Sequence, residues 1–239
     1  MSLHVIRSSR RHRRRIGQNA VPYSGKILGY GPIAYWIMGE AEGGAAIDQI
    51  NSPAQDGTYT GVTLGQAGVG DGNTCPLFDG ANDYLGLPNL AINKDEGTLV
   101  VWHKTASGTP IGSGYVWRYY LDSSNYFYLL IETVDRFLFR RLGNGTTVDV
   151  RYAGLAGTTI WMSVAITWSV SGNAQNVYVN GVPETQVAGL AAWNGGNSIV
   201  HCVGAFNNTP TGPINGYLAH MALFNSVLTP AQITDLATV

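Results

Sequence analysis

The sequence predicts an all-β protein, a two-sheet antiparallel jelly-roll sandwich, on three observations. Of its 239 residues only 12% are charged and 31 are glycine, whereas globular chains average about 25% charged residues and about 7% glycine. Helical bundles need charged faces, so this composition argues against them. Short runs rich in β-branched and aromatic residues also recur between turn-forming residues, which is typical of sandwich strands.

Composition also excludes other classes of protein. The apolar content of 45% is too high for wholesale disorder. No run approaches the roughly 20 apolar residues that a membrane helix needs, so no membrane partner is expected. The length fits a single all-β domain.

Residues 1–32 are predicted to lie outside the sandwich, as a basic N-terminal arm (1–20) and a Pro/Gly connector (21–32). The arm holds six arginines and no acid. These are Arg7, Arg10, Arg11, Arg13, Arg14 and Arg15. Residues 16–239 carry 8 basic and 15 acidic side chains, a net charge of −7. Self-repulsion predicts an extended arm on an acidic body, and a plain solvated tail is the competing interpretation.

Two further features bear on where the protein works. A secretory signal needs 7–15 apolar residues after its basic region, but the residues after the arm are polar, so export by this route is not expected. Cys75 and Cys202 form neither a disulfide framework nor a C-x-x-C site. We expect buried free thiols, with one long-range bridge as the alternative.

The remaining residues, 33–239, are predicted to form the sandwich. Its expected strands are 34–38, 84–87, 98–103, 115–121, 126–131, 137–141, 148–152, 160–168, 176–179, 199–204 and 217–224. Asn180-Gly181 and Asn144-Gly145 suit type I′ hairpin turns, because both residue types accept positive φ. Together with a turn at 171–173, they predict a run of adjacent antiparallel strands. The Gly-rich stretch 65–72 is predicted to be a loop.

One helix is predicted at the end of the chain. Thr229 suits the N-cap, Pro230 the first helical position, and Gln232 completes a capping box. Ile233 and Leu236 share an apolar face. We expect this short helix to cover an edge or an end of a sheet.

Four segments in order resemble the concanavalin A-like lectin/glucanase superfamily, and within it the laminin-G-like jelly rolls. They are Ala-Tyr-Trp-Ile-Met-Gly-Glu (34–40), the hairpin Cys-Pro-Leu-Phe-Asp-Gly-Ala-Asn-Asp-Tyr-Leu (75–85), the strand pair ending in Tyr-Val-Asn-Gly (164–181), and the last strand with its closing helix (216–233). Together they cover roughly residues 33–237. The resemblance implies two stacked antiparallel sheets, one of them concave, with loops at the rims.

No enzymatic activity is expected. Glucanases of this superfamily use paired carboxylates spaced as Glu-x-Asp-x-x-Glu, and glycoside hydrolysis needs such a pair. None of the five glutamates lies in that pattern. They are Glu40, Glu42, Glu96, Glu132 and Glu184. The separated His103, His201 and His220 are predicted to be hydrogen-bonded structural residues rather than metal ligands.

No cofactor or metal is claimed, although calcium is an open alternative. The resemblance implies a calcium site at a rim, to which Asp79, Asn82 and Asp83 could contribute oxygens. The same residues are ordinary turn formers, and turn formation is the favoured interpretation.

An aromatic segment at 115–128 is the candidate contact site for a glycan or a partner. Strand alternation predicts that Tyr115, Trp117 and Tyr119 share one side and Arg118, Tyr120 and Asp122 the other. The candidate contact residues are Trp117, Arg118, Tyr120, Asp122, Tyr126 and Tyr128. The competing interpretation is that both faces are packed, one in the core and one under the arm, a loop or another subunit.

An arginine-rich arm before a compact β domain also resembles viral structural proteins. The resemblance implies a non-enzymatic tailed-phage virion protein that decorates the head or attaches to a tail or fibre, assembled in the host cytoplasm and released by lysis. The arm would bind other virion proteins of the capsid, neck or tail. Nucleic acid is a disfavoured partner because the arm lacks interleaved aromatic residues; homo-oligomerisation stays open. The alternative function is a carbohydrate-binding or host-adhesion module.

Overall fold

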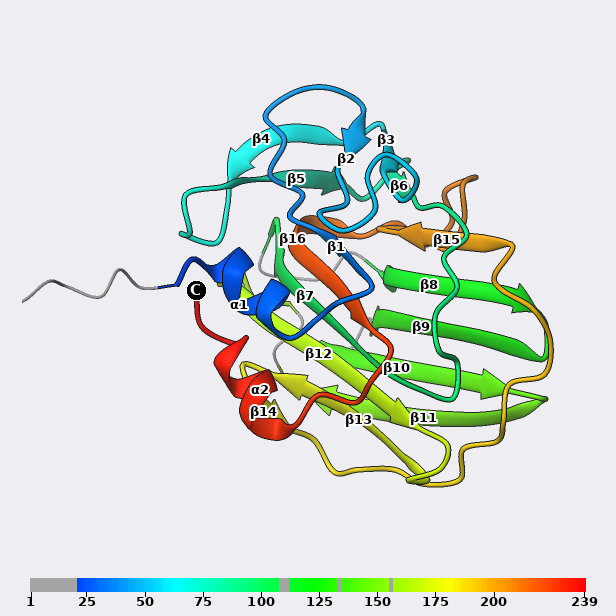
Figure 1. The fold of residues 1–239 in the computed structure, drawn as a ribbon. Coiled ribbons are helices and arrows are strands. Elements are labelled where there is room, and N and C mark those ends of the chain that lie inside the picture. Colours follow the sequence, from blue (N-terminus) through cyan, green and yellow to red (C-terminus); the bar gives the residue numbers. More distant parts are fainter. Residues whose placement is uncertain (1–20, 108–111, 133–134, 155–156) are drawn as a thin grey trace, which may run out of the picture.

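The protein is a sandwich of two antiparallel sheets in the part of the chain that can be described. The computed structural model describes residues 21–107, 112–132, 135–154 and 157–239. The predicted arm, with Arg7, Arg10, Arg11, Arg13, Arg14 and Arg15, lies outside these residues. Each sheet has eight strands within the described ranges (Figure 1). The predicted all-β, two-sheet jelly-roll fold is therefore confirmed.

The first sheet, sheet A, contains the predicted strands at 98–103, 160–168, 176–179 and 217–224. Its central strand pair is formed by strands far apart in the sequence, as is usual in a jelly roll. In spatial order, sheet A consists of β14 (Val182–Pro183), β13 (Ala174–Val179), β12 (Met162–Ser169), β7 (Glu96–Thr105), β16 (Asn215–Phe224), β5 (Thr74–Asp79) and β4 (Thr63–Ala67), with β1 (Ala34–Trp36) also paired to β16.

The second sheet, sheet B, contains the aromatic segment at its centre. In spatial order, it consists of β11 (Thr146–Ala153), β10 (Arg136–Gly143), β9 (Asn125–Glu132), β8 (Gly114–Asp122), β15 (Val200–Val203), β6 (Tyr84–Gly86), β3 (Gly57–Thr60) and β2 (Ala45–Ala46). The strands β2 to β5 and the short β14 were not predicted, and β4 includes part of the expected Gly-rich loop.

The space between the sheets is filled by alternate side chains of both. Trp117, Phe127 and Phe139 enter it from sheet B, and Val101 and Ile166 enter it from sheet A; all five are fully buried. Burial of apolar surface is the main free energy that holds such a sandwich together. Since strand side chains alternate, the residues between these core positions point away from the core.

Two of the predicted turns have the expected geometry. Asn144 and Gly145 have φ of 45° and 77°, and Asn180 and Gly181 have 50° and 77°. They close the hairpins β10–β11 and β13–β14. The predicted run of adjacent strands is interrupted, however, because β11 lies at the edge of sheet B and β12 in sheet A. Turn chemistry specifies only the two strands that the turn joins.

The closing helix is confirmed as α2 (Pro230–Asp235). Thr229 is its N-cap, and both hydrogen bonds of the capping box with Gln232 are present. Ile233 and Leu236 are buried on the outer side of sheet A.

The Pro/Gly connector predicted at 21–32 contains a helix that was not predicted. This helix, α1 (Tyr23–Gly29), buries Tyr23 and Ile27, which lie four residues apart and so share one face. Tertiary burial outweighs the low helix propensity of its glycines. Lys26 donates to the carbonyl of Thr238 at 3.0 Å, so the C-terminus lies beside α1 (Figure 1).

Candidate functional site

The outer face of sheet B carries a row of tyrosines and arginines. Arg118 and Tyr120 of β8 lie opposite Tyr128 and Tyr126 of β9, as the strand register shows. Their neighbours in sequence enter the core, so these four side chains point outward. For Arg118 and Tyr120, this is the shared side that alternation predicted. Tyr120 and Tyr126 stack with ring centroids 6.1 Å apart.

The structure corrects the placement of Tyr115. The register of β8 against β9 shifts between Tyr115 and Trp117. Such a bulge reverses the alternation, because one extra residue occupies the strand. Tyr115 therefore lies on the outer face, with its ring 5.3 Å from that of Tyr128 and 5.0 Å from that of Phe206. Simple alternation could not reveal this.

Trp117 is corrected as a contact residue, because it lies in the core with no exposed surface. Its Nε1 donates to Nε2 of His201 at 2.9 Å, and Nδ1 of His201 lies 3.0 Å from the carbonyl of Pro88. These partners require a neutral imidazole with its proton on Nδ1. Burial agrees, since it lowers the pKa of His201 to about 4.

Asp122 closes the turn between β8 and β9. Its Oδ1 accepts the backbone N–H of Ser124 at 2.7 Å and the side-chain amide of Asn125 at 3.1 Å. The register of β8 against β9 shifts again between Tyr120 and Asp122, so that Asp122 pairs with the buried Asn125 rather than following the alternation predicted for Arg118 and Tyr120. Asp122 is not among the residues that line the neighbouring cavity.

A cavity of about 580 Å³ opens among these side chains. Binding cavities for small molecules and sugars have volumes of about 300–1,000 Å³, so one or more sugar rings would fit. The lining residues come from β8, β9, β10, β15 and the segment after β15. They are Tyr115, Arg118, Tyr120, Ser123, Tyr126, Tyr128, Arg140, Val200, Phe206 and Asn207. We call this cavity the tyrosine pocket.

The candidate contact residues did not include six of the residues that line the tyrosine pocket. These six are Tyr115, Ser123, Arg140, Val200, Phe206 and Asn207. Arg140 lies on the same side of β10 as the outer residues of β9, since it pairs with Tyr128. Val200 faces Tyr120 across the β8–β15 pair. The pairing of strands brings Arg140 and Val200 to the aromatic segment, and the segment after β15 brings Phe206 and Asn207. A single sequence shows neither arrangement.

The two arginines of the pocket differ in their partners. Arg140 makes two hydrogen bonds of 2.6 Å to the carboxylate of Asp149. The bond to Asp149 raises the pKa of Arg140. Burial opposes ionisation of Asp149, but its bonds to Arg140 and Arg151 outweigh burial and lower its pKa. Arg118 instead donates from Nη1 to the carbonyl of Phe206 at 2.7 Å.

A second hollow of about 340 Å³ lies on the other side of the segment that contains Phe206 and Asn207. Its lining residues are Asp56, Thr58, Thr60, Tyr84, Gly86, Leu87, Pro88 and Asn208. One row of cross-strand neighbours, from Thr58 through Gly86 and Cys202 to Arg118, joins the two hollows. The outer face of sheet B therefore offers two adjacent depressions.

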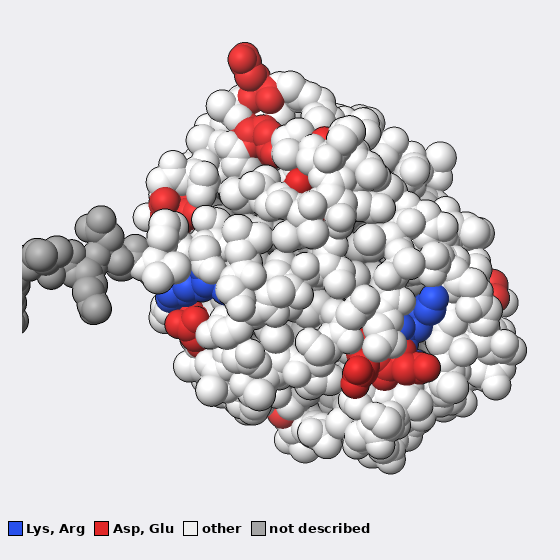
Figure 2. All heavy atoms as spheres, viewed as in Figure 1, with Lys and Arg blue, Asp and Glu red and all other residues white. Residues whose placement is uncertain are grey.

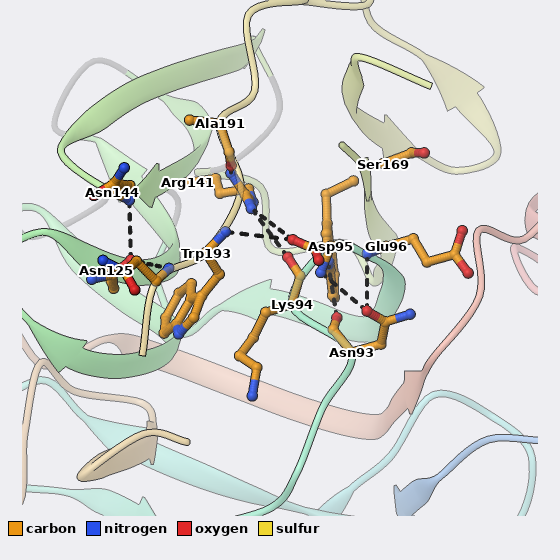
Figure 3. A network of polar contacts seen from close by, with 12 residues as sticks. Asn93, Lys94, Asp95, Glu96, Asn125, Arg141, Asn144, Ser169, Ala191 and Trp193 are labelled. Carbon is orange, nitrogen blue, oxygen red and sulfur yellow. Dashed lines mark hydrogen bonds and ion pairs between the residues drawn. The ribbon is translucent and has the colours of Figure 1, made fainter. Parts of the chain in front are cut away.

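A polar network fixes the rim beside the pocket (Figure 3). Arg141 follows Arg140 in β10 and points inward. Its Nη1 donates to the carbonyl of Ala191 at 2.5 Å and its Nη2 to that of Lys94 at 3.1 Å, while the Asp95 carboxylate lies 3.9 Å away. Burial lowers the pKa of Arg141 to about 10. The arginine thus joins the loops that precede β7 and β15.

Asn125 extends this network to the turns of sheet B (Figure 3). Its Oδ1 accepts the backbone N–H groups of Asn144 and Asn194, both at 3.0 Å. Trp193 stacks on Phe127 with ring centroids 5.1 Å apart. These contacts hold the segment that leads to Val200, and so they shape one wall of the tyrosine pocket.

The outer face of sheet A is covered instead. Tyr23 and Ile27 of α1, together with Ile233 and Leu236, pack on a cluster of buried side chains of that sheet. Tyr23 donates from its hydroxyl to the carbonyl of Leu236 at 2.9 Å and accepts from Nε1 of Trp102 at 2.7 Å. This side of the sandwich is closed by the protein's own helices.

A histidine under α1 is part of this closed side. Nδ1 of His220 lies 2.7 Å from the hydroxyl of Tyr35, and its Nε2 lies 2.9 Å from Oδ2 of Asp71. Burial lowers the pKa of His220, although Asp71 opposes the shift. His201 and His220 are thus hydrogen-bonded structural residues, as predicted, and His103 is fully buried.

Asp79 and Asp83 hold a turn together through side-chain hydrogen bonds to the backbone. Oδ2 of Asp83 accepts the N–H of Asp79, and Oδ1 of Asp79 accepts that of Ala81, both at 2.8 Å. Among the described residues, no group of three or more His, Cys, Asp or Glu side chains is placed to hold a metal ion. The turn interpretation is therefore supported.

The two cysteines are free thiols in the described part of the chain, as expected. Cys75 and Cys202 are both buried and unbridged. Burial raises their pKa values, to about 11 and about 12. None of the described helices has the length and apolar character needed to span a membrane.

Acidic side chains outnumber basic ones on this body, and the basic ones are unevenly placed. In the view of Figure 2 most of the surface is uncharged. Residues 21–239 carry 8 basic side chains. Half of them lie on the outer face of sheet B, as strand pairing shows. These four are Arg118, Arg136, Arg140 and Arg151.

Comparison with known proteins identifies a family that matches most of the chain. Residues 79–234 match the family described as the concanavalin A-like lectin/glucanases superfamily. A search among curated proteins finds no match.

Several solved structures are similar. Domain 4 of AbnA, an extracellular arabinanase from Geobacillus stearothermophilus in complex with arabinotriose, has a TM-score of 0.68 at 19% identity, over 86% of this chain and 97% of that one. The botulinum neurotoxin type G receptor binding domain has a TM-score of 0.62 at 14% sequence identity, and the match covers 86% of this chain and 50% of that one. The Trypanosoma rangeli sialidase in complex with the inhibitor DANA has a TM-score of 0.61 at 15% sequence identity, and the match covers 87% of this chain and 32% of that one. This chain therefore spans half or less of the latter two chains, and at these identities the likeness shows the fold.

Proposed function

Because the chain belongs to the concanavalin A-like lectin/glucanase superfamily, we propose that it is a carbohydrate-binding module that holds a glycan on the outer face of sheet B. One observation carries this proposal. Tyr120 and Tyr126 are half-buried, stack on each other, and border the tyrosine pocket. Both described helices lie on the opposite sheet, so no helix among the described residues covers this aromatic row.

The chemistry of the pocket suits a sugar. The C–H face of a pyranose ring is apolar and packs on flat aromatic rings, while its hydroxyl groups need hydrogen-bonding partners. Tyr126 and Tyr128 stack with nearly parallel rings, at 5.7 Å and 7°. Ser123 and Asn207 place polar groups beside them. The second hollow continues the surface, which favours a glycan chain over a single sugar.

The similar structures support this proposal without deciding it. The arabinanase domain was solved with arabinotriose, and the sialidase with an inhibitor. At identities of 19% and below, a shared ligand does not follow from the shared fold, so the ligand of this chain has to be found by experiment.

We propose that the module is not an enzyme. The ten described lining residues of the tyrosine pocket include no Asp or Glu, whereas glycoside hydrolysis ordinarily uses two carboxyl groups across the scissile bond. The nearest charged pair on the lining strands is Arg140 with Asp149, and that carboxylate is engaged by two arginines. Incubation with the bound polysaccharide should leave its chain length unchanged.

A glycan array followed by calorimetry tests the binding proposal. We expect Tyr126→Ala to weaken binding of the strongest array ligand by at least about tenfold, because stacked aromatic contacts contribute about 1–3 kcal/mol. Tyr217→Ala is the matched control, since this half-buried tyrosine lies on the outer side of sheet A against Lys104 and Trp161. Equal losses in both variants, or no ligand for the unaltered protein, would contradict the proposal.

We propose in addition that the arginine-rich arm attaches the module to a virus particle. The six arginines of residues 7–15 contrast with the acidic body, and charge complementarity steers such docking. The arm leads into α1, which lies on sheet A, so an attached module would keep sheet B free. Deleting residues 1–20 should leave a folded body that fails to join particles; normal incorporation, or salt-sensitive DNA binding by the arm, would argue against this role.

A further inference from the structure

Arg118 is a buried cation without a counter-ion. It is only 4% exposed, and its Nη1 donates to the carbonyl of Phe206. Among the described residues, that is the only acceptor it reaches, and its Nε is buried without a partner. An arginine has five N–H donors, so most of its hydrogen-bonding capacity is unused.

The other arginines of the described body show how unusual this is. Each of them has a carboxylate within 4 Å: Arg140 is paired with Asp149, and Arg136 and Arg151 share Glu132 at 3.0 and 3.3 Å. Even Arg141, which is buried and also has an unpartnered Nε, lies 3.9 Å from Asp95. Removing a cation from water without pairing it costs free energy, and proteins rarely retain such a group without a role. Burial removes water from the guanidinium of Arg118 and thereby lowers its pKa.

Aromatic rings restrict how a ligand can reach this cation. The centre of the guanidinium lies 3.4 Å from the ring centroid of Phe206 and 4.1 Å from that of Tyr120. With rings against the guanidinium, its N–H edge is what remains for a ligand in the pocket. A planar carboxylate matches that edge, because two parallel N–H···O bonds form in one plane.

A second unpaired atom lines the same pocket. Oδ1 of Asn207 is buried and has no hydrogen-bond donor within the described structure. The pocket therefore combines unused donors on Arg118 with an unused acceptor on Asn207. A carboxylate and a neighbouring hydroxyl on one sugar ring would satisfy both.

We propose that the tyrosine pocket binds an acidic sugar, a uronic acid residue of a polysaccharide, with its carboxylate on Arg118 and a hydroxyl on Asn207. This inference rests on the proposed carbohydrate-binding function and names the class of glycan. The carboxylate supplies the counter-ion that Arg118 lacks, and the stacked tyrosines hold the ring.

Two ligands that differ only at the carboxylate give the sharpest test. The full chain is titrated by calorimetry with oligogalacturonate and with the same oligosaccharide after reduction of its carboxyl groups to alcohols. We expect the acidic form to bind at least about tenfold more tightly, since hydrogen bonds to charged groups are among the strongest in proteins. Sialylated and sulfated oligosaccharides show whether another anionic sugar is preferred, which would overturn the uronic acid assignment.

Variants then locate the effect. Arg118→Gln should abolish the preference for the acidic ligand, and Arg118→Lys should reduce it because lysine lacks the planar edge. Arg151→Gln is the matched control: it removes the same charge from the same face but from outside the pocket lining. The control should keep the preference.

The outcomes separate this inference from the proposed function. Tyr126-dependent binding of neutral glycans without any preference for the acidic form would overturn the inference and leave the carbohydrate-binding proposal standing. Failure of every glycan to bind would overturn both. If Arg118→Gln does not fold, the ligand pair on the unaltered protein still decides.

Discussion

The outer faces of the two sheets differ in what covers them. On sheet A, Tyr23 and Ile27 of α1 and Leu236 beside α2 bury the sheet and satisfy its polar groups internally. On sheet B, Tyr120 and Tyr126 remain half exposed beside a pocket that holds an unpaired arginine. Both faces are rich in aromatic residues, so composition does not separate them. The difference is whether the protein itself supplies the partners.

The largest expected effect contrasts one tyrosine from each face. Tyr23→Ala should lower the free energy of unfolding by about 3–5 kcal/mol, because it opens a cavity in the packed cover of sheet A. Tyr126→Ala should cost about 1 kcal/mol or less. Denaturant unfolding of both variants measures this difference. Similar losses would mean that sheet B's outer face contributes to stability as sheet A's does.

The second expected effect compares two buried histidines. His201 has a pKa lowered to about 4 by burial, while an unfolded histidine titrates near 6.5. The unfolded state therefore takes up the proton first as the pH falls. The free energy of unfolding should be unaffected above pH 7 and should decrease by about 3 kcal/mol between pH 6.5 and 4 through this residue.

Glutamine at position 201 isolates that contribution. Gln keeps a donor for the Pro88 carbonyl and an acceptor for Trp117 but does not titrate. His201→Gln should flatten the pH dependence more than His220→Gln, because Asp71 favours the protonated form of His220. Urea unfolding at pH 7, 5.5 and 4 is the measurement. An unchanged slope in His201→Gln would show that folding does not lower the pKa of this histidine.

The smallest expected effect concerns the cover of sheet A. Thr229→Ala removes both the side-chain acceptor for Gln232 and the capping box of α2, at a cost of about 1 kcal/mol. Glycan binding on sheet B should be unchanged, since the two faces are separated by the core. Thermal unfolding and calorimetry of this variant check both statements, and a parallel loss of binding would show that the faces are coupled.

Much of the fold could be predicted because its determinants are local. Hairpins at Asn144-Gly145 and Asn180-Gly181 follow from residues that accept positive φ, and α2 follows from its capping box. The helix α1 was missed because its stability comes from burial of Tyr23 and Ile27 against a distant sheet. Local propensity contains no information on such contacts.

The candidate site was predictable in part. Alternation placed Arg118 and Tyr120 on one face of β8, but the bulges beside Tyr115 and Asp122 were not visible in the sequence. Trp117 was assigned to the site because large aromatic residues suit both cores and binding surfaces. Pairing between distant strands and the segment that follows β15 complete the pocket, and both depend on tertiary structure.

One measurement tests the central claim most directly. An NMR titration of the full, isotope-labelled chain with the strongest array glycan shows which backbone amides the ligand perturbs. We predict the largest shifts in β8 and β9 and at Phe206 and Asn207, with α1 and α2 unaffected. Shifts confined to the helices and sheet A would contradict the claim that the open face of sheet B is the binding surface.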